Sequence, residues 1–233
     1  MTRYLILDCG GVLVYPRLGD WSLPLATTKI LGERARDIHT SKYLLAHRQS
    51  AGWLDEARLI RDVEEERNCR REYIRAMDVR MDWHMTAEEI DALTDDFTDN
   101  IRRYGFFDDS EPFMKRWKAK GLKLGMLSDA MPSILVFMEK AGLAKHMDAM
   151  VISTQVGATK PDAKMYAAIL EALNAEAADC LFVDDRAENL EGAIRAGMKA
   201  VQMARSAFPP LTLWDGPVAR SFSELDALIE SEA

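Results

Sequence analysis

The sequence predicts an α/β fold: a parallel sheet with helices on both faces, and an inserted segment that is all helical. Three observations support this prediction. Short apolar runs of the buried-strand type recur along the chain, helix patterns separate the later runs, and residues 15–107 contain no convincing strand. Because parallel strands need crossover connections, helices between such strands favour a parallel sheet that is covered on both faces.

Five segments read as buried strands because each is a nearly continuous apolar run. They are residues 4–8, 122–127, 149–154, 180–185 and 199–204. Helix patterns that end at glycines, or that begin after Pro161-Asp162, lie between the later strands. Ligands of such sheets bind at the carboxyl ends of the strands, so Asp8, Ser128 and the pair Asp184-Asp185 are expected to face one crevice.

The stretch from Tyr15 to Phe107 has a different character. It is dense in Arg, Glu and Asp and carries amphipathic helix patterns, one of which starts at a capping box made by Thr86 and Glu89. We therefore expect a helical subdomain inserted after the first strand. The stretch has no Gly/Ser linker, so the subdomain is expected to pack on the core.

Length, charge and cysteine usage limit the class of protein. A chain of 233 residues with 48% hydrophobic residues can bury a substantial core. The net charge of −8 comes without a basic stripe, so nucleic acid is not an expected partner. Three cysteines without a CxxC pair indicate reduced thiols and a cytoplasmic location. No stretch is apolar and long enough to span a membrane, and the first apolar run is too short for a signal peptide.

Four short motifs carry a family resemblance. They are Asp8 in LILDCGGVLV, Ser128 in LGMLSDA, Lys160 in GATKPDAKMY and Asp184-Asp185 in CLFVDDRAENLEGAIRAGM. In order and context they resemble the four motifs of the haloacid dehalogenase (HAD) superfamily, in the subfamily I branch with a helical C1-type cap. Motif one has a DxGG form and motif four a DD form. The resemblance implies a Rossmann-like core at residues 1–14 and 108–233 and a cap at 15–107, which resembles the family only in position and helicity.

The resemblance implies a phosphatase that acts on a small phosphorylated metabolite. Asp8 would attack phosphorus and form an aspartyl phosphate, which water then cleaves. Ser128, at the start of a helix expected near Met131, and Lys160 complete the catalytic set because a hydroxyl donor and a compact positive charge suit phosphoryl oxygens. The residues expected to bind the substrate are Gly10, Gly11, Ser128, Asp129 and Lys160.

The acidic pair points to a metal ion. Adjacent carboxylates at a dry crevice repel each other unless a cation or a lysine neutralises them, and Mg²⁺ prefers oxygen ligands. A turn and a helix cap would explain the pair without a metal. By resemblance, Asp184 is the more direct ligand, Asp185 acts directly, through water or by pairing with Lys160, and Asn189 has a supporting role. The implied ligand set is Asp8, the backbone carbonyl of Gly10, Asp184 and Asp185.

Gly10 departs from the family pattern. Most related phosphatases carry an Asp there as general acid and base, which is worth roughly a hundred- to ten-thousand-fold in rate. A water, a substrate whose leaving group needs no proton, or a cap residue such as His39, His47 or Asp55 could compensate. Each of these three residues is also explained by an ordinary solvated helix face.

Other functions stay open at this point. A 2-haloacid dehalogenase needs no acid because halide leaves unprotonated, but such a site has little reason to keep the acidic pair. A catalytically weak member could bind a ligand or a protein through the cap. A cysteine-based phosphatase is excluded by spacing, since Tyr15 stands where Cys9 would need an arginine. No glycine-rich nucleotide loop is present, so no nucleotide cofactor is expected.

Overall fold

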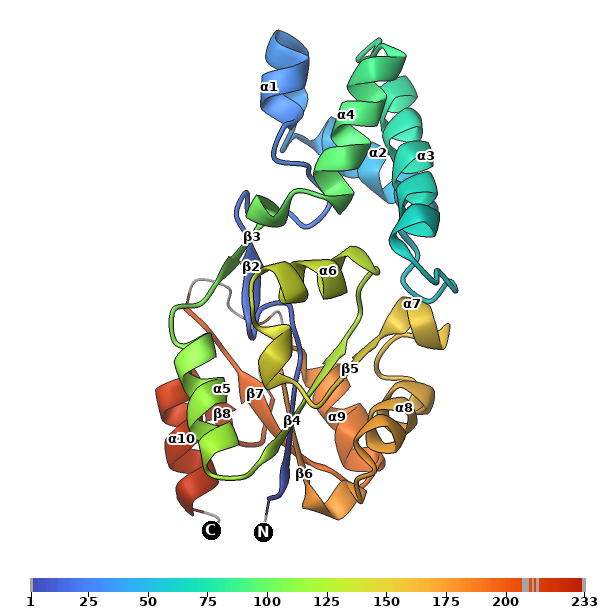
Figure 1. Cartoon of the computed structure of the whole chain (residues 1–233). Coiled ribbons are helices and arrows are strands. Elements are labelled where there is room, and N and C mark those ends of the chain that lie inside the picture. Colours follow the sequence, from blue (N-terminus) through green and yellow to red (C-terminus); the bar gives the residue numbers. More distant parts are fainter. Residues whose placement is uncertain (1, 207–209, 211, 213, 232–233) are drawn as a thin grey trace.

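Six strands form a parallel sheet in the order β5-β4-β1-β6-β7-β8 in the computed structural model, which describes residues 2–206, 210, 212 and 214–231 (Figure 1). The strands are β1 (Tyr4–Leu7), β4 (Lys123–Ser128), β5 (Ala149–Ile152), β6 (Cys180–Asp184), β7 (Lys199–Met203) and β8 (Val218–Ala219). Strand β1 pairs in parallel with β4 on one side and β6 on the other. The residues after β1, β4 and β6 therefore meet at one edge of the sheet.

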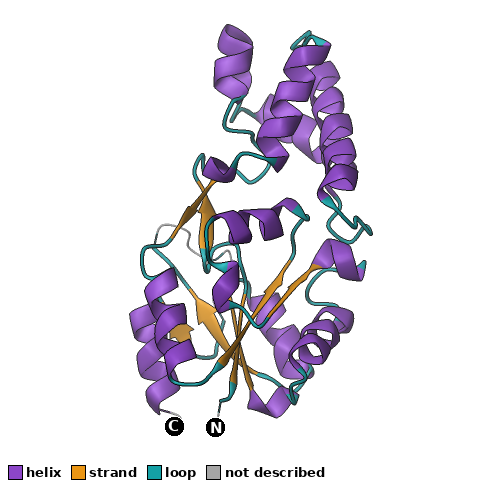
Figure 2. Ribbon diagram, viewed as in Figure 1, coloured by secondary structure: helices purple, strands orange, loops and turns teal. Residues whose placement is uncertain are grey.

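Helices cover both faces of the sheet, as the sequence predicts (Figure 2). Leu5 and Leu7 of β1 pack on one side with α5 (Ser110–Ala119), α6 (Ser133–Lys140) and α10 (Phe222–Ser231). Tyr4 and Ile6 pack on the other side with α8 (Ala163–Leu173) and α9 (Ala187–Arg195). Because successive side chains of a strand point to opposite faces, one short run supplies both halves of the core. All four residues of β1 are buried.

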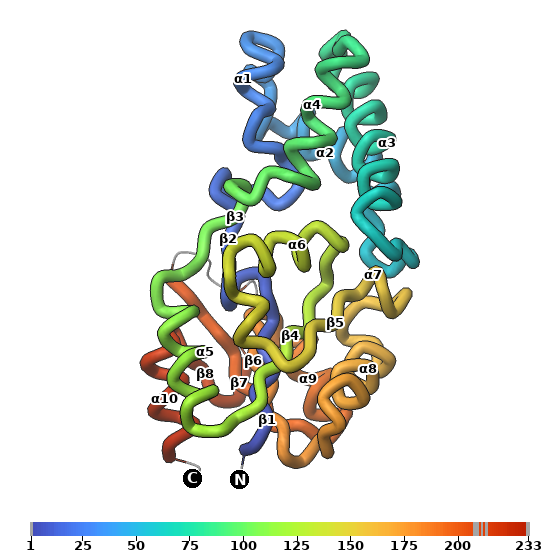
Figure 3. Tube along the Cα trace, viewed as in Figure 1, coloured from blue at the N-terminus to red at the C-terminus, as the bar shows by residue number. Residues whose placement is uncertain are grey.

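Helices α1 to α4 stand together at one end of the molecule (Figure 3). The elements are α1 (Thr27–Leu31), η1 (Gly32–Asp37), α2 (Ser41–Ser50), η2 (Ala51–Leu54), α3 (Val63–Met81), α4 (Ala87–Thr98) and η3 (Ile101–Arg103). The capping box of Thr86 and Glu89 is confirmed at the start of α4. Tyr73 and Phe97 belong to a separate small core inside these helices. We call residues 17–103 the helical unit.

A two-stranded antiparallel ribbon joins the helical unit to the sheet. It is formed by β2 (Val14–Pro16) and β3 (Tyr104–Phe106). The expectation that residues 15–107 contain no strand was therefore wrong. Each strand has three residues, too few for a hydrophobic period to be visible in the sequence. The ring of Tyr15 fills the space that a side chain at Gly105 would need, 2.3 Å from a Cβ at that position.

Several boundaries differ from those expected. The run at 149–154 ends as a strand at Ile152 and continues as the short helix α7 (Ser153–Val156). The helix expected near Met131 begins at Ser133, and the two-residue strand β8 was not predicted. Two further 3-10 turns are η4 (Ala144–His146) and η5 (Ala177–Asp179). Of the core predicted at 108–233, residues 207–209, 211, 213, 232 and 233 lie outside the described part of the chain.

Hydrogen bonds hold the start of α3, and the segment before it, against the sheet domain. The Glu66 carboxylate accepts hydrogen bonds from the backbone nitrogen of Ser133 (2.7 Å) and from its hydroxyl (2.8 Å). The backbone nitrogen of Ile60 donates to the carbonyl oxygen of Thr154 (2.9 Å). The helical unit is thus attached at the ribbon and again at α3. Among the described residues, no helix has the length and apolar character needed to cross a membrane.

Candidate active site

Lys160 joins the ends of two strands. Its ammonium donates to Asp8 Oδ1 (2.8 Å), to Asp184 Oδ2 (2.6 Å) and to the carbonyl oxygen of Leu127 (3.1 Å). Asp8 follows β1, Asp184 ends β6, and both side chains are buried together with that of Lys160. An ammonium has three protons, so every one of them is engaged. Lys160 therefore ties two carboxylates together below the crevice.

Asp184 is fully satisfied by neighbouring donors. Besides Lys160, it accepts hydrogen bonds from the side-chain nitrogen of Asn189 (3.0 and 3.1 Å) and from the backbone nitrogen of Arg186 (2.8 Å). The side-chain oxygen of Asn189 is buried and has no hydrogen-bond partner in the described structure. Asn189 thus orients Asp184 and leaves an unsatisfied acceptor beside it.

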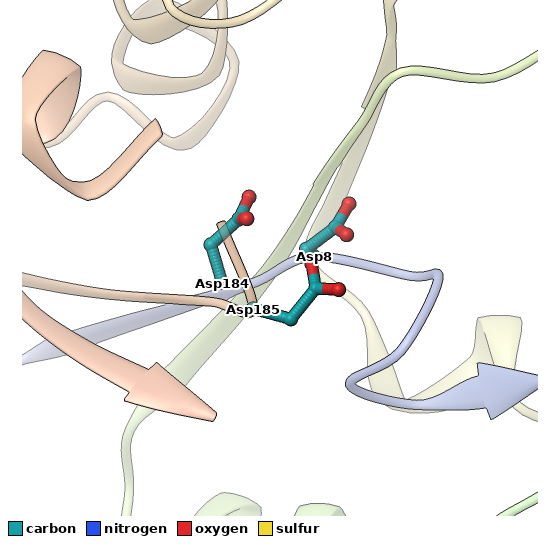
Figure 4. Close-up of side chains that lie close together, drawn as sticks. All are labelled: Asp8, Asp184 and Asp185. Atoms are coloured by element: carbon teal, nitrogen blue, oxygen red, sulfur yellow. The ribbon is translucent and has the colours of Figure 1, made fainter. Parts of the chain in front are cut away.

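Asp185 has the opposite character, although it is the next residue. Its side chain is half-buried, and no hydrogen bond or ion pair links its carboxylate to another described residue. Figure 4 shows it close to Asp8 and Asp184, and the three carboxylates offer oxygens within 4.8 Å of one another. The ion pair considered for Asp185 and Lys160 is made by Asp184 instead.

The cluster carries more negative than positive charge and is buried. Both conditions shift the pKa values of its groups. Burial raises the pKa of Asp8 to about 6, against the attraction of Lys160. Burial and the charges of Asp8 and Asp184 raise the pKa of Asp185 to about 7. Burial disfavours the charged form of Lys160, but the carboxylates around it outweigh this effect and hold its pKa above the usual value. Three carboxylates thus lie close together, and the ammonium of Lys160 pairs with two of them, Asp8 and Asp184.

Neighbouring side chains leave little space for a side chain at either glycine of the first motif. Gly11 has φ +71°, and a Cβ there would lie 2.8 Å from Asp185 Oδ2. A Cβ on Gly10 would lie 3.2 Å from the ring of Trp21. The tryptophan ring therefore occupies the space into which a side chain at position 10 would extend. Cys9, between Asp8 and these glycines, is buried in the core as expected, and burial, followed by the charge of Asp8, raises the pKa of its thiol.

A cavity of about 700 Å³ lies above the cluster, between the sheet and the helical unit. The predicted site residues that line it are Asp8, Gly10, Gly11, Ser128, Asp129, Lys160, Asp185 and Asn189. Asp184 lies beneath them and is fully buried. The sequence-based prediction thus names side chains that the fold brings to one place.

The helix terminus expected beside Ser128 already carries one anionic partner. The first backbone nitrogen of α6, at Ser133, donates to Glu66 of the helical unit. The anion-binding role expected of this terminus beside Ser128 stays a prediction. Ser128 itself is buried at the end of β4 and lines the cavity. Asp129 Oδ1 accepts a hydrogen bond from the backbone nitrogen of Lys160 (2.9 Å), and burial raises the pKa of Asp129.

The helical unit contributes residues that sequence reasoning missed. Those that line the cavity with polar or aromatic side chains include Trp21, Glu56 and Arg70. Of the cap residues proposed from the sequence, His47 lines the cavity, whereas His39 and Asp55 do not. Nothing in the local sequence distinguishes Glu56 from Asp55, since both belong to one polar segment. Only the way the helical unit packs on the sheet domain places Glu56, and not Asp55, at the cavity.

Comparison with known proteins identifies a family and several relatives. The family model of haloacid dehalogenase-like hydrolases matches residues 2–197. A phosphatase of Mycobacterium tuberculosis is 37% identical over 128 residues, which cover 53% of this chain and 56% of the relative. The chain spans about half the length of several curated relatives that it matches.

Solved structures agree with the fold at low sequence identity. The L-2-haloacid dehalogenase of Xanthobacter autotrophicus is 18% identical with a TM-score of 0.69, over 100% of both chains. A HAD phosphatase of Thermococcus onnurineus is 19% identical with a TM-score of 0.65, over 98% of both chains. These two structures support the fold, and they do not separate phosphatase from dehalogenase.

Proposed function

This chain belongs to the haloacid dehalogenase-like hydrolase family, and we propose that it is a Mg²⁺-dependent phosphatase acting on a small phosphorylated metabolite. The observation that carries the proposal is the excess of negative charge below the cavity, where Lys160 pairs with Asp8 and Asp184 and the nearby Asp185 carboxylate has no partner among the described residues. A phosphate dianion would be repelled by this cluster alone. A divalent cation between the carboxylates and the phosphoryl oxygens removes the repulsion.

The residues fit such a cation. We propose Asp8, the backbone carbonyl of Gly10 and the acidic pair as its ligands, with Asp185 rather than Asp184 in direct contact. Asp184 already accepts four hydrogen bonds, whereas the Asp185 carboxylate has no partner among the described residues. Burial is the main cause of the raised pKa values of Asp8 and Asp185, and a nearby cation would lower both values by favouring the charged carboxylates. Bound Mg²⁺ would supply that charge and polarise the phosphoryl group.

The protein's own residues support covalent catalysis at Asp8. Lys160 fixes the orientation of the Asp8 carboxylate through the 2.8 Å ion pair. We propose that this carboxylate attacks phosphorus, that the Ser128 hydroxyl donates to a phosphoryl oxygen, and that water then cleaves the aspartyl phosphate. We propose that Gly10, Gly11, Asp129 and Lys160, which all line the cavity, border the phosphoryl group beside the nucleophile.

We further propose that residues 15–107 act as a cap over a core formed by 1–14 and 108–233. The cavity lies between these two parts, and both contribute to its lining. Residues of the cap would then select the organic part of the substrate.

A dehalogenase is the second candidate, and one observation favours it. Position 10 has no acid side chain, and the ring of Trp21 lies where one would extend. Halide leaves without a proton, so this arrangement would do no harm. Against it, the carboxylate of a haloacid would meet the same excess of negative charge at Asp8 and Asp185. The phosphatase of Mycobacterium tuberculosis among the relatives also favours phosphoryl transfer.

Hydrolysis of p-nitrophenyl phosphate tests the proposal. We expect turnover with Mg²⁺, loss of turnover with a chelator, and a fall of roughly 10³- to 10⁶-fold in kcat in the Asp8→Asn variant. Asp179→Asn is the matched control, because Asp179 lies at the opposite edge of the sheet, before β6. Metal-independent release of halide from a 2-haloacid would overturn the phosphatase in favour of the dehalogenase. Absence of both activities would overturn hydrolysis and leave a binding role.

A further inference from the structure

One carboxylate of the cavity wall has no part in the scheme above. Glu56 lies between η2 and α3 and lines the same cavity as Asp8 and Ser128. Its side chain is half-buried, and it forms no hydrogen bond or ion pair with any other described residue. A desolvated carboxylate without a partner is costly to the fold, so its position calls for an explanation.

The segment that carries Glu56 is held in place on both sides. Before it, the Asp55 side chain accepts a hydrogen bond from the backbone nitrogen of Ala57 (2.9 Å). After it, the backbone of Ile60 is bonded to Thr154 of the sheet domain (2.9 Å). Glu56 is therefore presented to the cavity by a segment fixed to the core.

The charges that face Glu56 come from both parts of the molecule. Its pKa is raised to about 7, chiefly by burial and also by the charges of Asp129 and Asp8, whereas Arg70 and Lys160 act in the opposite direction. The other ionisable groups that line the cavity are Cys9, His47, Tyr104, Asp185 and Arg186. Near neutral pH, Glu56 can thus both give and take a proton, as a general acid and base must.

Neighbouring groups do not suit this task. The Arg70 guanidinium offers only hydrogen-bond donors and is paired with Glu66 (3.1 Å). The ring nitrogen Nδ1 of His47 is engaged with the Tyr73 hydroxyl (2.9 Å). Asp129 holds the backbone of Lys160. Position 10 cannot supply an acid, because it is a glycine beside the ring of Trp21.

We propose that Glu56 is the general acid and base of this enzyme and replaces, from the helical unit, the acid that position 10 lacks. This inference rests on the proposed phosphatase function. As Asp8 attacks phosphorus, the bond to the leaving oxygen breaks and that oxygen takes the proton of the Glu56 carboxyl group, which releases an alcohol. Water then attacks the aspartyl phosphate and gives a proton to Glu56, the bond between phosphorus and Asp8 breaks, and inorganic phosphate leaves. Glu56 ends in its protonated form and Asp8 as a carboxylate.

A series of aryl phosphates tests the role of Glu56. It runs from p-nitrophenyl phosphate, whose leaving group is acidic, to phenyl phosphate, whose leaving group needs a proton. In the Glu56→Gln variant we expect kcat/KM to fall by roughly 100-fold or more for phenyl phosphate and by less than about tenfold for p-nitrophenyl phosphate. For the unaltered enzyme, kcat/KM with phenyl phosphate should fall as pH rises through about 7, and this limb should be absent in the variant. Glu64→Gln, which changes an exposed carboxylate that does not line the cavity, should match the unaltered enzyme.

The outcomes separate this inference from the function on which it rests. Equal losses for all members of the series, or no loss, would overturn the role of Glu56 while the phosphatase stands. A pH limb that persists in Glu56→Gln would do the same. If the unaltered protein hydrolyses no member of the series with Mg²⁺, the phosphatase itself fails, and the role of Glu56 fails with it.

Discussion

The strand ends and the junction with the helical unit both bury ionic side chains, but they balance charge differently. At the strand ends, the ammonium of Lys160 pairs with Asp8 and Asp184, and Asp185 lies beside them without a partner among the described residues. At the junction, Glu66 is paired with Arg70 (3.1 Å) and accepts two further hydrogen bonds from Ser133. The strand-end cluster has more negative than positive charge, whereas the charge of Glu66 at the junction is balanced by Arg70.

This difference indicates which group is built for chemistry. A balanced pair with full hydrogen bonding holds two parts of a fold together and has no need of a ligand. An unbalanced cluster is stable only when protons or a cation compensate it, and the pKa of Asp8 at about 6 and of Asp185 at about 7 shows the same need. The imbalance lies under the cavity, where a ligand can relieve it.

The largest expected effect on stability follows from removing the positive charge of the strand-end cluster. Lys160→Met leaves Asp8 and Asp184 buried without a counter-charge, so we expect the free energy of unfolding in chelator to fall by about 3–5 kcal/mol above pH 7. The loss should shrink as pH falls toward about 6, because removal of Lys160 raises the pKa of Asp8 and protonation of Asp8 then removes part of the repulsion. Urea unfolding at pH 5 and pH 8 measures both effects.

The matched control is Lys164→Met, which changes an exposed lysine on α8. It should leave the unfolding midpoint nearly unchanged at both pH values. Mg²⁺ should restore part of the stability of Lys160→Met, because a cation can take over the compensation. If both lysine variants behave alike in chelator, the strand-end cluster is not held by its ammonium.

How far the sequence could predict these two groups depends on the range of the contacts. Apolar runs ending in Asp8, Ser128 and Asp184 are local signals, and the topology of a parallel sheet brings their ends together whatever the helical unit does. The pairing of Glu66 with Ser133 joins residues 67 positions apart across the junction, and no local pattern marks it. Glu56 differs from Asp55 only through the same docking. The candidate nucleophile and metal ligands could therefore be proposed from sequence, whereas the cavity wall could not.

A smaller effect is expected at the balanced junction. Glu66→Gln keeps one acceptor oxygen but removes the charge that faces Arg70 and Ser133, so we expect a loss of about 2 kcal/mol in the free energy of unfolding. Glu64→Gln, on the exposed face of the same helix, should lose less than about 1 kcal/mol. Urea unfolding in chelator compares them directly. A loss for Glu66→Gln as small as that for Glu64→Gln would mean that the junction contact does not stabilise the fold.

The smallest expected effect on stability concerns Gly11. A substitution there separates the cost of backbone strain from a loss of Mg²⁺ binding at Asp185. Gly11→Ala and Gly19→Ala both place a Cβ at positive φ, +71° and +72°, which costs roughly 1 kcal/mol in each case. Only at Gly11 does the new Cβ meet a side chain, Asp185 Oδ2 at 2.8 Å, since nothing lies within 4 Å of that position at Gly19. The two variants should therefore lose similar stability in chelator, while the concentration of Mg²⁺ needed for half-maximal hydrolysis of p-nitrophenyl phosphate rises for Gly11→Ala alone. Equal Mg²⁺ requirements in the two variants would show that Asp185 does not hold the ion, and direct contact would then fall to the crowded carboxylate of Asp184.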